Sequence, residues 1–376
     1  MKRLVIAAGG GGDVIAAAML RTALYGPTAP ALVLTYSWER LTVDPLPGPR
    51  GRADFTGLAT PLPGLALVTG DSTALAPAGS SLPRLARDLG GPLGLLDPYD
   101  GAAGLARTVA AAAAYCGAER IDVVDVGGDI LAAGDEPTLR SPLGDALVLA
   151  ACARSGLPAD VYVTGPGLDR EIPEAELFAR LPPPAFALPA EATAPVRRIF
   201  DWHPSEASAM LAAAARGVRG LCGIRDVPEP LRLDARSAGV HRLTLAQAMA
   251  RNPLARLLTD ARTLSQAEQA SVEVCGFSEI ARERARAAAP AESAPDDAEF
   301  PVLPGDGPTG PVTRHARWQS ALRGRGITLV TQRRLTEGLA LDEASVHLLR
   351  ARLSTDPAQN AAPLWRVPGR AAAAGA

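Results

Sequence analysis

The sequence predicts an α/β protein built on a doubly wound, mostly parallel, Rossmann-like sheet. Short apolar runs alternate with stretches of helical periodicity over residues 4–224, which is the pattern of parallel strands joined by crossover helices. Most of these apolar runs are continuous, as expected for strands buried on both faces. Glycine and acidic residues directly follow many of the runs. Because ligands bind outside the carboxyl ends of such strands, these residues predict a ligand site at that edge.

The individual elements follow from these runs in chain order. The predicted strands are Leu4–Ala8, Ala31–Tyr36, Leu65–Thr69, Leu93–Leu96, Ile121–Val126, Val161–Thr164, Val196–Asp201 and Gly220–Ile224. The predicted helices between them are Val14–Tyr25, Leu82–Leu89, Ala102–Cys116, Pro142–Arg154, Glu174–Leu181 and Ser205–Arg216. A segment rich in Pro and Gly at residues 38–64 is expected to be a rigid surface loop, either a lid or a wrap over one sheet edge.

The domain organisation follows from changes in composition along the chain. Residues 1–286 are predicted to form a Rossmann-like α/β domain that ends in a helical extension. Residues 287–312 are rich in Ala, Pro, Asp and Glu and poor in large apolar side chains, which is typical of a linker. A small helix–strand–helix unit is predicted for residues 313–356, and a disordered tail for residues 357–376.

Composition and charge exclude several classes of protein. The 38 basic and 40 acidic residues give a net charge of -2, so we expect no nucleic-acid partner. No apolar stretch reaches the roughly 20 residues needed to span a bilayer, and the apolar run that ends at Ala8 is too short for a signal-peptide core. The four cysteines form no CxxC pair, which argues against a zinc or redox motif. We therefore expect a cytoplasmic protein without a membrane partner, and the sequence is compatible with a homo-oligomer.

The first predicted strand is followed by Gly9, Gly10, Gly11 and Gly12 and then by Asp13. A strand, a glycine turn and a helix N-terminus together form an anion site, because unpaired N–H groups and the helix dipole face the ligand. The loop fits neither the dinucleotide pattern G-x-G-x-x-G nor the pattern G-x-x-x-x-G-K-[ST]. Asp13 either caps the helix or binds a hydroxyl, an amine or a Mg²⁺ ion that bridges it to a phosphate.

Acidic residues recur after other predicted strands. Glu39 lies at the end of the second strand, where an acid can accept hydrogen bonds from a ribose, or is simply a solvated charge. Asp129, Asp135, Glu136 and Asp145 lie close together after the fifth strand. Such oxygen ligands hold Mg²⁺ or Mn²⁺, or they cap turns. The predicted cation ligands are Asp13, Asp129 and Asp135.

His203 is one of four histidines in the chain. It follows a predicted strand and precedes Ser205, which is expected to cap the next helix. Histidine is the usual group for proton transfer near neutral pH, although a lone histidine is more often a packed or surface residue. The predicted catalytic residues are His203, Asp129 and Asp169, and we expect Asp13, Asp129 and Asp169 to face one common cleft.

Several of these segments together resemble a known family. The combination is similar to the archaeal and actinobacterial family catalogued as domain of unknown function 1152, over roughly residues 1–290. This resemblance implies an α/β fold and an actinobacterial source, and it implies no particular reaction. The segments that carry it are Ala8–Val14, Trp38–Arg40, Asp44–Pro49, Val124–Asp129, Gly165–Asp169 and Pro204–Ala207.

The sequence favours an enzyme that acts on a small polar, phosphorylated or nucleotide-like ligand at the glycine loop, by transferase or lyase chemistry. Mg²⁺ together with a nucleotide is the cofactor pair that these residues would suit. A non-catalytic nucleotide sensor or partner subunit is the alternative. An NAD-type oxidoreductase is a weaker alternative, because the dinucleotide pattern is incomplete and the class would need Glu39 to face a ribose.

Overall fold

The computed structural model describes residues 3–225, 229–289 and 310–369. The centre of its main sheet consists of parallel strands, each paired in parallel with the next. These strands are β1 (Arg3–Ala7), β2 (Ala31–Tyr36), β7 (Leu93–Leu96), β8 (Ile121–Val126) and β9 (Ala159–Thr164). They lie in the order β7-β2-β1-β8-β9, so the chain moves outward in one direction from β1 and in the other from β8. The predicted α/β class and the mostly parallel central sheet are confirmed.

Antiparallel strands extend both edges of this sheet. On one side β5 (Leu65–Val68) pairs with β7, and β4 (Ala59–Leu62) pairs with β5. On the other side β13 (Gly239–Thr244) pairs with β9, and β10 (Phe186–Ala187) pairs with β13. A separate small ribbon joins β3 (Phe55–Thr56) to β6 (Thr73–Ala74). The antiparallel edges leave the carboxyl ends of the parallel strands together at one rim.

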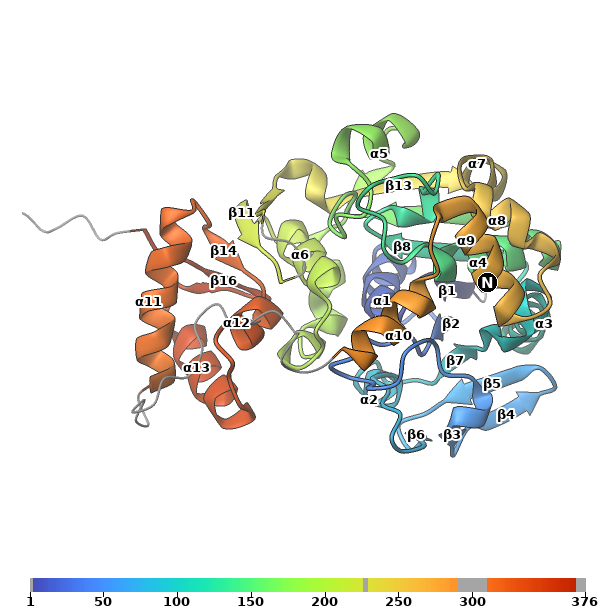
Figure 1. The fold of residues 1–376 in the computed structure, drawn as a ribbon, viewed down its shortest axis with the longest axis horizontal. Helices are drawn as coiled ribbons and strands as arrows, with labels where there is room; N and C mark the ends of the chain where they lie inside the picture. Colours follow the sequence, from blue (N-terminus) through green and yellow to red (C-terminus); the bar gives the residue numbers. More distant parts are fainter. Residues whose placement is uncertain (1–2, 226–228, 290–309, 370–376) are drawn as a thin grey trace, which may run out of the picture.

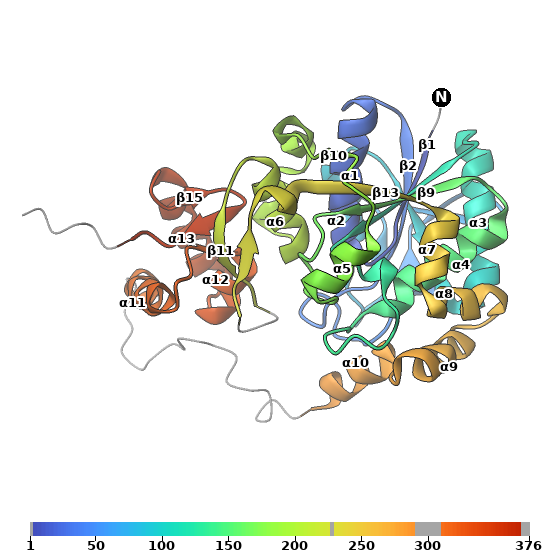
Figure 2. The same cartoon turned by 90° about the horizontal axis from the view of Figure 1, so that it is seen from above.

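Helices cover both faces of the sheet, as Figure 2 shows. Successive side chains of a strand point to opposite faces, so Val5 of β1 joins one core cluster and Leu4 the other. The first face is covered by α1 (Gly11–Tyr25), α2 (Leu82–Asp88) and α6 (Glu206–Ala215). The second face is covered by α3 (Gly101–Cys116), α4 (Pro142–Ser155), α7 (Leu245–Arg251), α8 (Pro253–Leu257) and α9 (Leu264–Cys275). The remaining helices of this part are α5 (Glu174–Arg180) and α10 (Glu279–Ala288).

A second sheet connects the C-terminal unit to the main body. Its order is β12-β11-β14-β16-β15. The strands are β11 (Gly220–Gly223), β12 (Leu231–Leu233), β14 (Leu329–Val330), β15 (Asn360–Ala361) and β16 (Leu364–Arg366), and the helices of the unit are α11 (Gly310–Gly324), α12 (Gln332–Gly338) and α13 (Glu343–Thr355). Because β14 pairs in parallel with β11, the unit continues a sheet begun by the main body and lies beside α6 (Figure 1).

Two predicted strands differ from the structure. Residues 190–201 form the 3₁₀ helices Ala190–Val196 and Ile199–Asp201, and not a strand. Their buried side chains include Val196, Ile199 and Phe200, which follow the spacing of a helix face rather than the alternation of a strand. The predicted strand Gly220–Ile224 exists as β11, but it belongs to the second sheet.

The predicted disordered tail at residues 357–376 is wrong for the residues that the structure describes. β15 and β16 lie within it, and Leu364, Trp365 and Val367 are buried. These side chains gain more from burial in the core than the ordering of this short segment costs. Most of the predicted linker at residues 287–312 lies outside the described residues, as do residues 370–376 of the tail. Among the described helices, none has the length and apolar character needed to cross a membrane.

Candidate functional site

A cavity of about 470 Å³ opens at the carboxyl ends of the parallel strands. The loops after β1, β2, β8 and β9 and the N-terminal end of α6 all contribute to its wall. β1 and β8 are neighbours in the sheet, yet the chain leaves them toward opposite sides. Crevices at such a change of direction are the usual ligand sites of open α/β sheets. The position predicted from the sequence is therefore the position of this cavity.

Three buried carboxyl groups meet beside this cavity, and two of them, Asp13 and Asp145, line it. Asp13 belongs to the first turn of α1, Asp125 to β8 and Asp145 to the first turn of α4. One carboxyl oxygen from each residue lies within 4.8 Å of the others. Asp125 and Asp145 are only 1% and 3% exposed. Oδ2 of Asp125 and Oδ1 of Asp145 are buried without a hydrogen-bond partner among the described residues. We call these three residues the carboxylate triad.

The triad is electrostatically unfavourable without a positive partner. Burial, with the charges of Asp145 and Asp13, raises the pKa of Asp125 well above its ordinary value. Burial and the charge of Asp13 likewise raise the pKa of Asp145. Burial raises the pKa of Asp13 to about 7, although a hydrogen bond from Gly9 opposes the shift. Buried carboxylates of this kind need a cation or a proton to offset the loss of hydration.

The glycine loop differs from its predicted form. α1 begins at Gly11 with Gly10 as its N-cap, so Asp13 is the third residue of the helix and not the cap. The Gly9 amide donates a hydrogen bond of 2.8 Å to Oδ2 of Asp13. A methyl group on Gly9 would lie 2.9 Å from the same oxygen. The loop therefore uses one of its amides to position the Asp13 carboxyl group.

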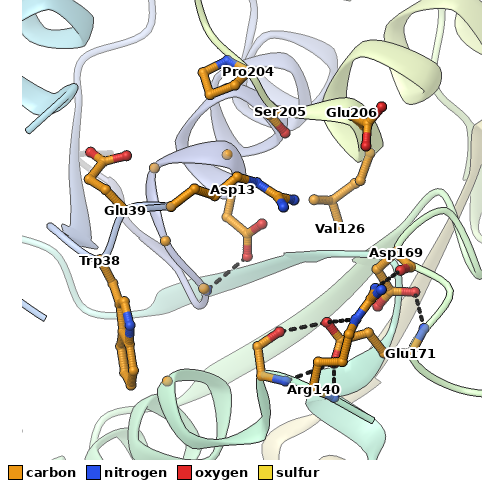
Figure 3. Close-up of a pocket in the computed structure, with 18 of the residues that line it drawn as sticks. Asp13, Trp38, Glu39, Val126, Arg140, Asp169, Glu171, Pro204, Ser205 and Glu206 are labelled. Carbon is orange, nitrogen blue, oxygen red and sulfur yellow. Dashed lines mark hydrogen bonds and ion pairs between the residues drawn. The ribbon is translucent and has the colours of Figure 1, made fainter. Parts of the chain in front are cut away.

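A second acidic group lies beside the triad, on the Asp169 side of the cavity in Figure 3. Glu171 holds the segment that leads into α4 by accepting hydrogen bonds from the Arg140 amide at 2.7 Å and the Ser141 amide at 2.9 Å. Asp169 keeps Oδ2 buried without a hydrogen-bond partner within the described part of the chain. Burial and the charge of Glu171 raise the pKa of Asp169 to about 7. Gly127 has a φ of 124° and passes so close to Asp169 that a methyl group would clash with its carboxyl carbon at 2.2 Å.

Glu39 lines the cavity on the side away from Asp169 (Figure 3), and Ser81 holds it in place. Oε1 of Glu39 accepts hydrogen bonds from the Ser81 amide at 2.8 Å and from the Ser81 hydroxyl at 2.5 Å. The hydrogen bonds anchor Glu39 to the start of α2. A methyl group on Gly11 would lie 2.9 Å from Oγ of Ser81 and 3.4 Å from Nε2 of His203. Gly11 thus keeps the space between these side chains open.

His203 is a buried hydrogen-bond donor. The Ser205 amide donates to Nδ1 of His203 at 3.2 Å, so the neutral ring carries its proton on Nε2. Nε2 is buried and has no hydrogen-bond partner among the residues described. Burial and the nearby positive charge of Arg40 lower the pKa of His203 to about 3. The ring is neutral near pH 7 and offers an N–H group to the cavity.

The structure brings most of the predicted site residues to one cavity. Asp135 is the exception, because it is exposed and does not line the cavity. Asp145 belongs to the acidic cluster that the sequence offered for Mg²⁺ or Mn²⁺, although it was not one of the three predicted cation ligands, and Asp125 was not predicted at all. The overlooked signal for Asp125 is an acid inside an apolar strand, where a carboxyl group is costly to bury. The predicted residues that line the cavity are Gly9, Gly10, Gly11, Gly12, Asp13, Glu39, Asp129, Asp169 and His203.

The triad has the chemistry of a divalent cation site. Carboxylate oxygens are the ligands that Mg²⁺, Mn²⁺ and Ca²⁺ prefer. Two oxygens on opposite sides of such a cation, each at roughly 2.1 to 2.4 Å, lie about 4.2 to 4.8 Å apart. The three triad oxygens lie within 4.8 Å of one another, as oxygens that bind one cation must, and the unpartnered oxygens of Asp125 and Asp145 would gain the partner that they lack.

The fold and the site define an α/β protein with an acidic cavity where the strand order changes direction. A family model described as "Protein of unknown function (DUF1152)" matches residues 4–287. The chain therefore belongs to the family named domain of unknown function 1152, which confirms the resemblance seen in the sequence. Comparison with curated proteins and with solved structures finds no match. The matched residues include the triad, Asp169 and His203, and end before the C-terminal unit.

Proposed function

We propose that this protein is a divalent-cation-dependent enzyme that acts on a small polar, phosphorylated or nucleotide-like substrate. The observation that carries the proposal is the carboxylate triad, with buried oxygens of Asp125 and Asp145 that lack a partner among the described residues. Mg²⁺ in proteins is commonly held by one or two carboxylates together with substrate phosphates. When bound, such a cation would polarise a phosphoryl or carbonyl oxygen and offset the charge of the substrate.

The strand order supports a substrate of this class. The order β7-β2-β1-β8-β9 corresponds to the 3-2-1-4-5 order of Rossmann-like folds, which bind nucleotides at the β1 loop. In this chain Asp13 already accepts the Gly9 amide, so a bare phosphate at the loop would be repelled. A cation on the triad would remove that repulsion, and the first amides of α1 would still favour an anion.

Other side chains of the cavity have defined tasks in this proposal. Asp129 and Asp169 would accept hydrogen bonds from hydroxyl or amino groups of the substrate. His203, the predicted proton-transfer residue, is better suited to donate a fixed hydrogen bond from Nε2, because its lowered pKa keeps the ring neutral. Proton transfer would then fall to Asp169, whose raised pKa of about 7 lies near neutrality and therefore suits a general acid or base. Transferase or lyase chemistry fits this set of groups.

Cation binding is the direct test of the proposal. We expect Mn²⁺, titrated by electron paramagnetic resonance, to bind the wild-type protein and to lose at least tenfold in affinity in Asp125→Asn and Asp145→Asn. Asp135→Asn is the matched control, because Asp135 is an exposed acid outside the cavity. Equal Mn²⁺ binding by all four proteins, or none by the wild type, would contradict the proposal.

Turnover distinguishes the enzyme from a nucleotide sensor or partner subunit. A thermal-shift screen of nucleotides and sugar phosphates with Mg²⁺ identifies ligands, since a ligand at a hundred times its dissociation constant adds about 2.7 kcal/mol of stability. Chemical conversion of a bound compound supports the enzyme, and tight binding without conversion supports the sensor. The NAD-type oxidoreductase is less well supported, because Oε1 of Glu39 already accepts two hydrogen bonds from Ser81.

A further inference from the structure

The C-terminal unit contributes a side chain to the cavity. Among the described residues that line the cavity, Arg333 of α12 is the one that comes from beyond α10. The family match ends at residue 287. A side chain from outside the part shared with the family therefore reaches the same cavity as the carboxylate triad.

The shared sheet explains how Arg333 arrives there. β14 pairs in parallel with β11, with Leu329 opposite Cys222. Thr331 follows β14 directly and caps α12 by accepting the Arg334 amide at 3.1 Å. Nη1 of the buried Arg334 donates to the Ile224 carbonyl at 3.1 Å. The first turn of α12 is therefore anchored to the segment that follows β11, close to the start of α6.

Glu206, the first residue of α6, contacts this first turn of α12. It accepts hydrogen bonds from the Thr331 hydroxyl and from the Arg225 amide at 2.9 Å. Nη1 of Arg333 approaches Oε2 of Glu206 at 3.4 Å. Glu206 is 4% exposed, so the C-terminal unit contacts a buried acid that also lines the cavity.

The guanidinium of Arg333 is held in a defined orientation. Its Nε donates to Oε1 of Glu337 at 2.8 Å, and Oε2 of Glu337 accepts from Nε of Arg225 at 3.1 Å. The two arginines and the carboxylates of Glu206 and Glu337 thus form an alternating cluster in which only 11% of the Arg333 side chain is exposed. A planar guanidinium that is held in one orientation is well suited to bind phosphate oxygens.

We propose that Arg333 binds a phosphoryl group of the ligand, and that other oxygens of the same ligand bind the cation on the carboxylate triad. This inference rests on the proposed function. It adds that the side chain contributed by the C-terminal unit binds a phosphoryl group. Arg333 reaches the cavity only when the C-terminal unit is docked on the main body. Phosphoryl binding and docking of the unit therefore stabilise each other. The ligand site of this chain thus consists of the family core and the added unit together.

The test compares Arg333→Gln with Arg352→Gln, which removes an exposed arginine of the same unit. The probe is inorganic pyrophosphate, titrated calorimetrically with the full chain in saturating Mg²⁺. We expect Arg333→Gln to weaken pyrophosphate binding at least tenfold while Mn²⁺ affinity stays within threefold, and Arg352→Gln to bind like the wild type. Arg333→Lys, which keeps the charge and loses the fork, should bind with intermediate affinity.

Each contrary result has a distinct meaning. Unchanged pyrophosphate affinity in Arg333→Gln overturns the inference, and so does a wild-type protein that binds Mn²⁺ but no pyrophosphate. Failure of the wild type to bind Mn²⁺ instead overturns the proposed function. Hydrogen exchange without ligand separates binding from a purely structural role. Faster exchange at residues 203–211 in Arg333→Gln would mean that Arg333 merely holds α6 in place, which also overturns the inference.

Discussion

The Gly9 amide donates a 2.8 Å hydrogen bond to Oδ2 of Asp13, so a carboxyl group stands where glycine loops usually present bare amides to a phosphate. The glycine loop, which resembles an anion site in the sequence, thus holds the buried carboxyl group of Asp13 in place. Because of this contact, we expect the loop to bind a cation that carries a bound anion, and not a free anion.

Asp13→Asn separates the structural role of this side chain from its role in cation binding. The amide oxygen of Asn can still accept the Gly9 hydrogen bond, so we expect the free energy of unfolding to change by less than about 1 kcal/mol. Loss of a negatively charged ligand should lower Mn²⁺ affinity at least tenfold, about 1.4 kcal/mol. Urea denaturation and electron paramagnetic resonance measure the two quantities. Wild-type affinity in a stable variant would exclude Asp13 from the cation site.

Gly10→Ala should be more damaging than its position in a loop suggests. The added methyl group would lie 2.4 Å from the backbone oxygen of Trp38, and a backbone atom cannot move aside as a side chain can. We expect a cost of about 1–3 kcal/mol in urea denaturation. Gly91→Ala is the control, since a methyl group there meets nothing within 4 Å. Equal stability of the two variants would show that the backbone at Trp38 can shift to accommodate the methyl group at little cost in free energy.

His203 should remain neutral throughout the physiological range. Its pKa is lowered to about 3 by burial and by Arg40, so no proton is taken up between pH 8 and pH 5. The side-chain ¹⁵N chemical shifts of His203 should stay constant over this range, with the proton on Nε2. A histidine-containing model peptide, which titrates near pH 6.5, provides the control. A titration of His203 near neutrality would restore it as a candidate for proton transfer.

Asp160 makes the stability of the fold depend on acid pH. Burial alone would raise its pKa, but hydrogen bonds from Arg242 and Arg120, both of 2.8 Å, hold the pKa below its ordinary value. A carboxylate with a depressed native pKa stabilises the protein above its unfolded pKa of roughly 3.9. This stabilisation is lost as the pH falls through the native pKa.

We therefore expect Asp160→Asn to destabilise the protein by about 1 kcal/mol at pH 7, because both arginines are partly exposed and such pairs are weak. Denaturation at several pH values should show the difference from the wild type shrinking below pH 4. Asp160 lies near the amino end of β9, away from the cavity, so Mn²⁺ affinity should not change. A difference that is constant down to pH 2 would argue against the ion pairs as its cause.

The C-terminal unit should unfold together with the main body. Leu329 of β14 is fully buried and belongs to the core cluster that contains Val5 of β1 and Met210 of α6. Leu329→Ala should therefore cost about 2–5 kcal/mol and lower the midpoint of one common thermal transition. Leu348→Ala, which removes a half-exposed side chain of α13, should change stability by less than about 0.5 kcal/mol. Two separated transitions in Leu329→Ala would mean that the unit folds independently.

The sequence by itself determined the features that depend on local pattern. The apolar runs predicted β1, β2, β7, β8 and β9, since a strand buried on both faces must be apolar along its length. The glycines and acids after these strands located the cavity, because parallel strands bring their carboxyl ends to one edge. The predicted strand Val196–Asp201 was wrong because a short apolar run fits a buried 3₁₀ turn equally well.

The tertiary structure decided which of the acids act together. Asp125 and Asp145 are 20 positions apart, and both meet Asp13 because β8 lies beside β1 and α4 begins at the same rim. Asp135 lies only a few positions after Asp129 in the chain, yet it is exposed to solvent. Arg333 reaches the cavity through the pairing of β14 with β11. Such proximities arise from strand order and sheet pairing between distant segments, and no local pattern of residues encodes them.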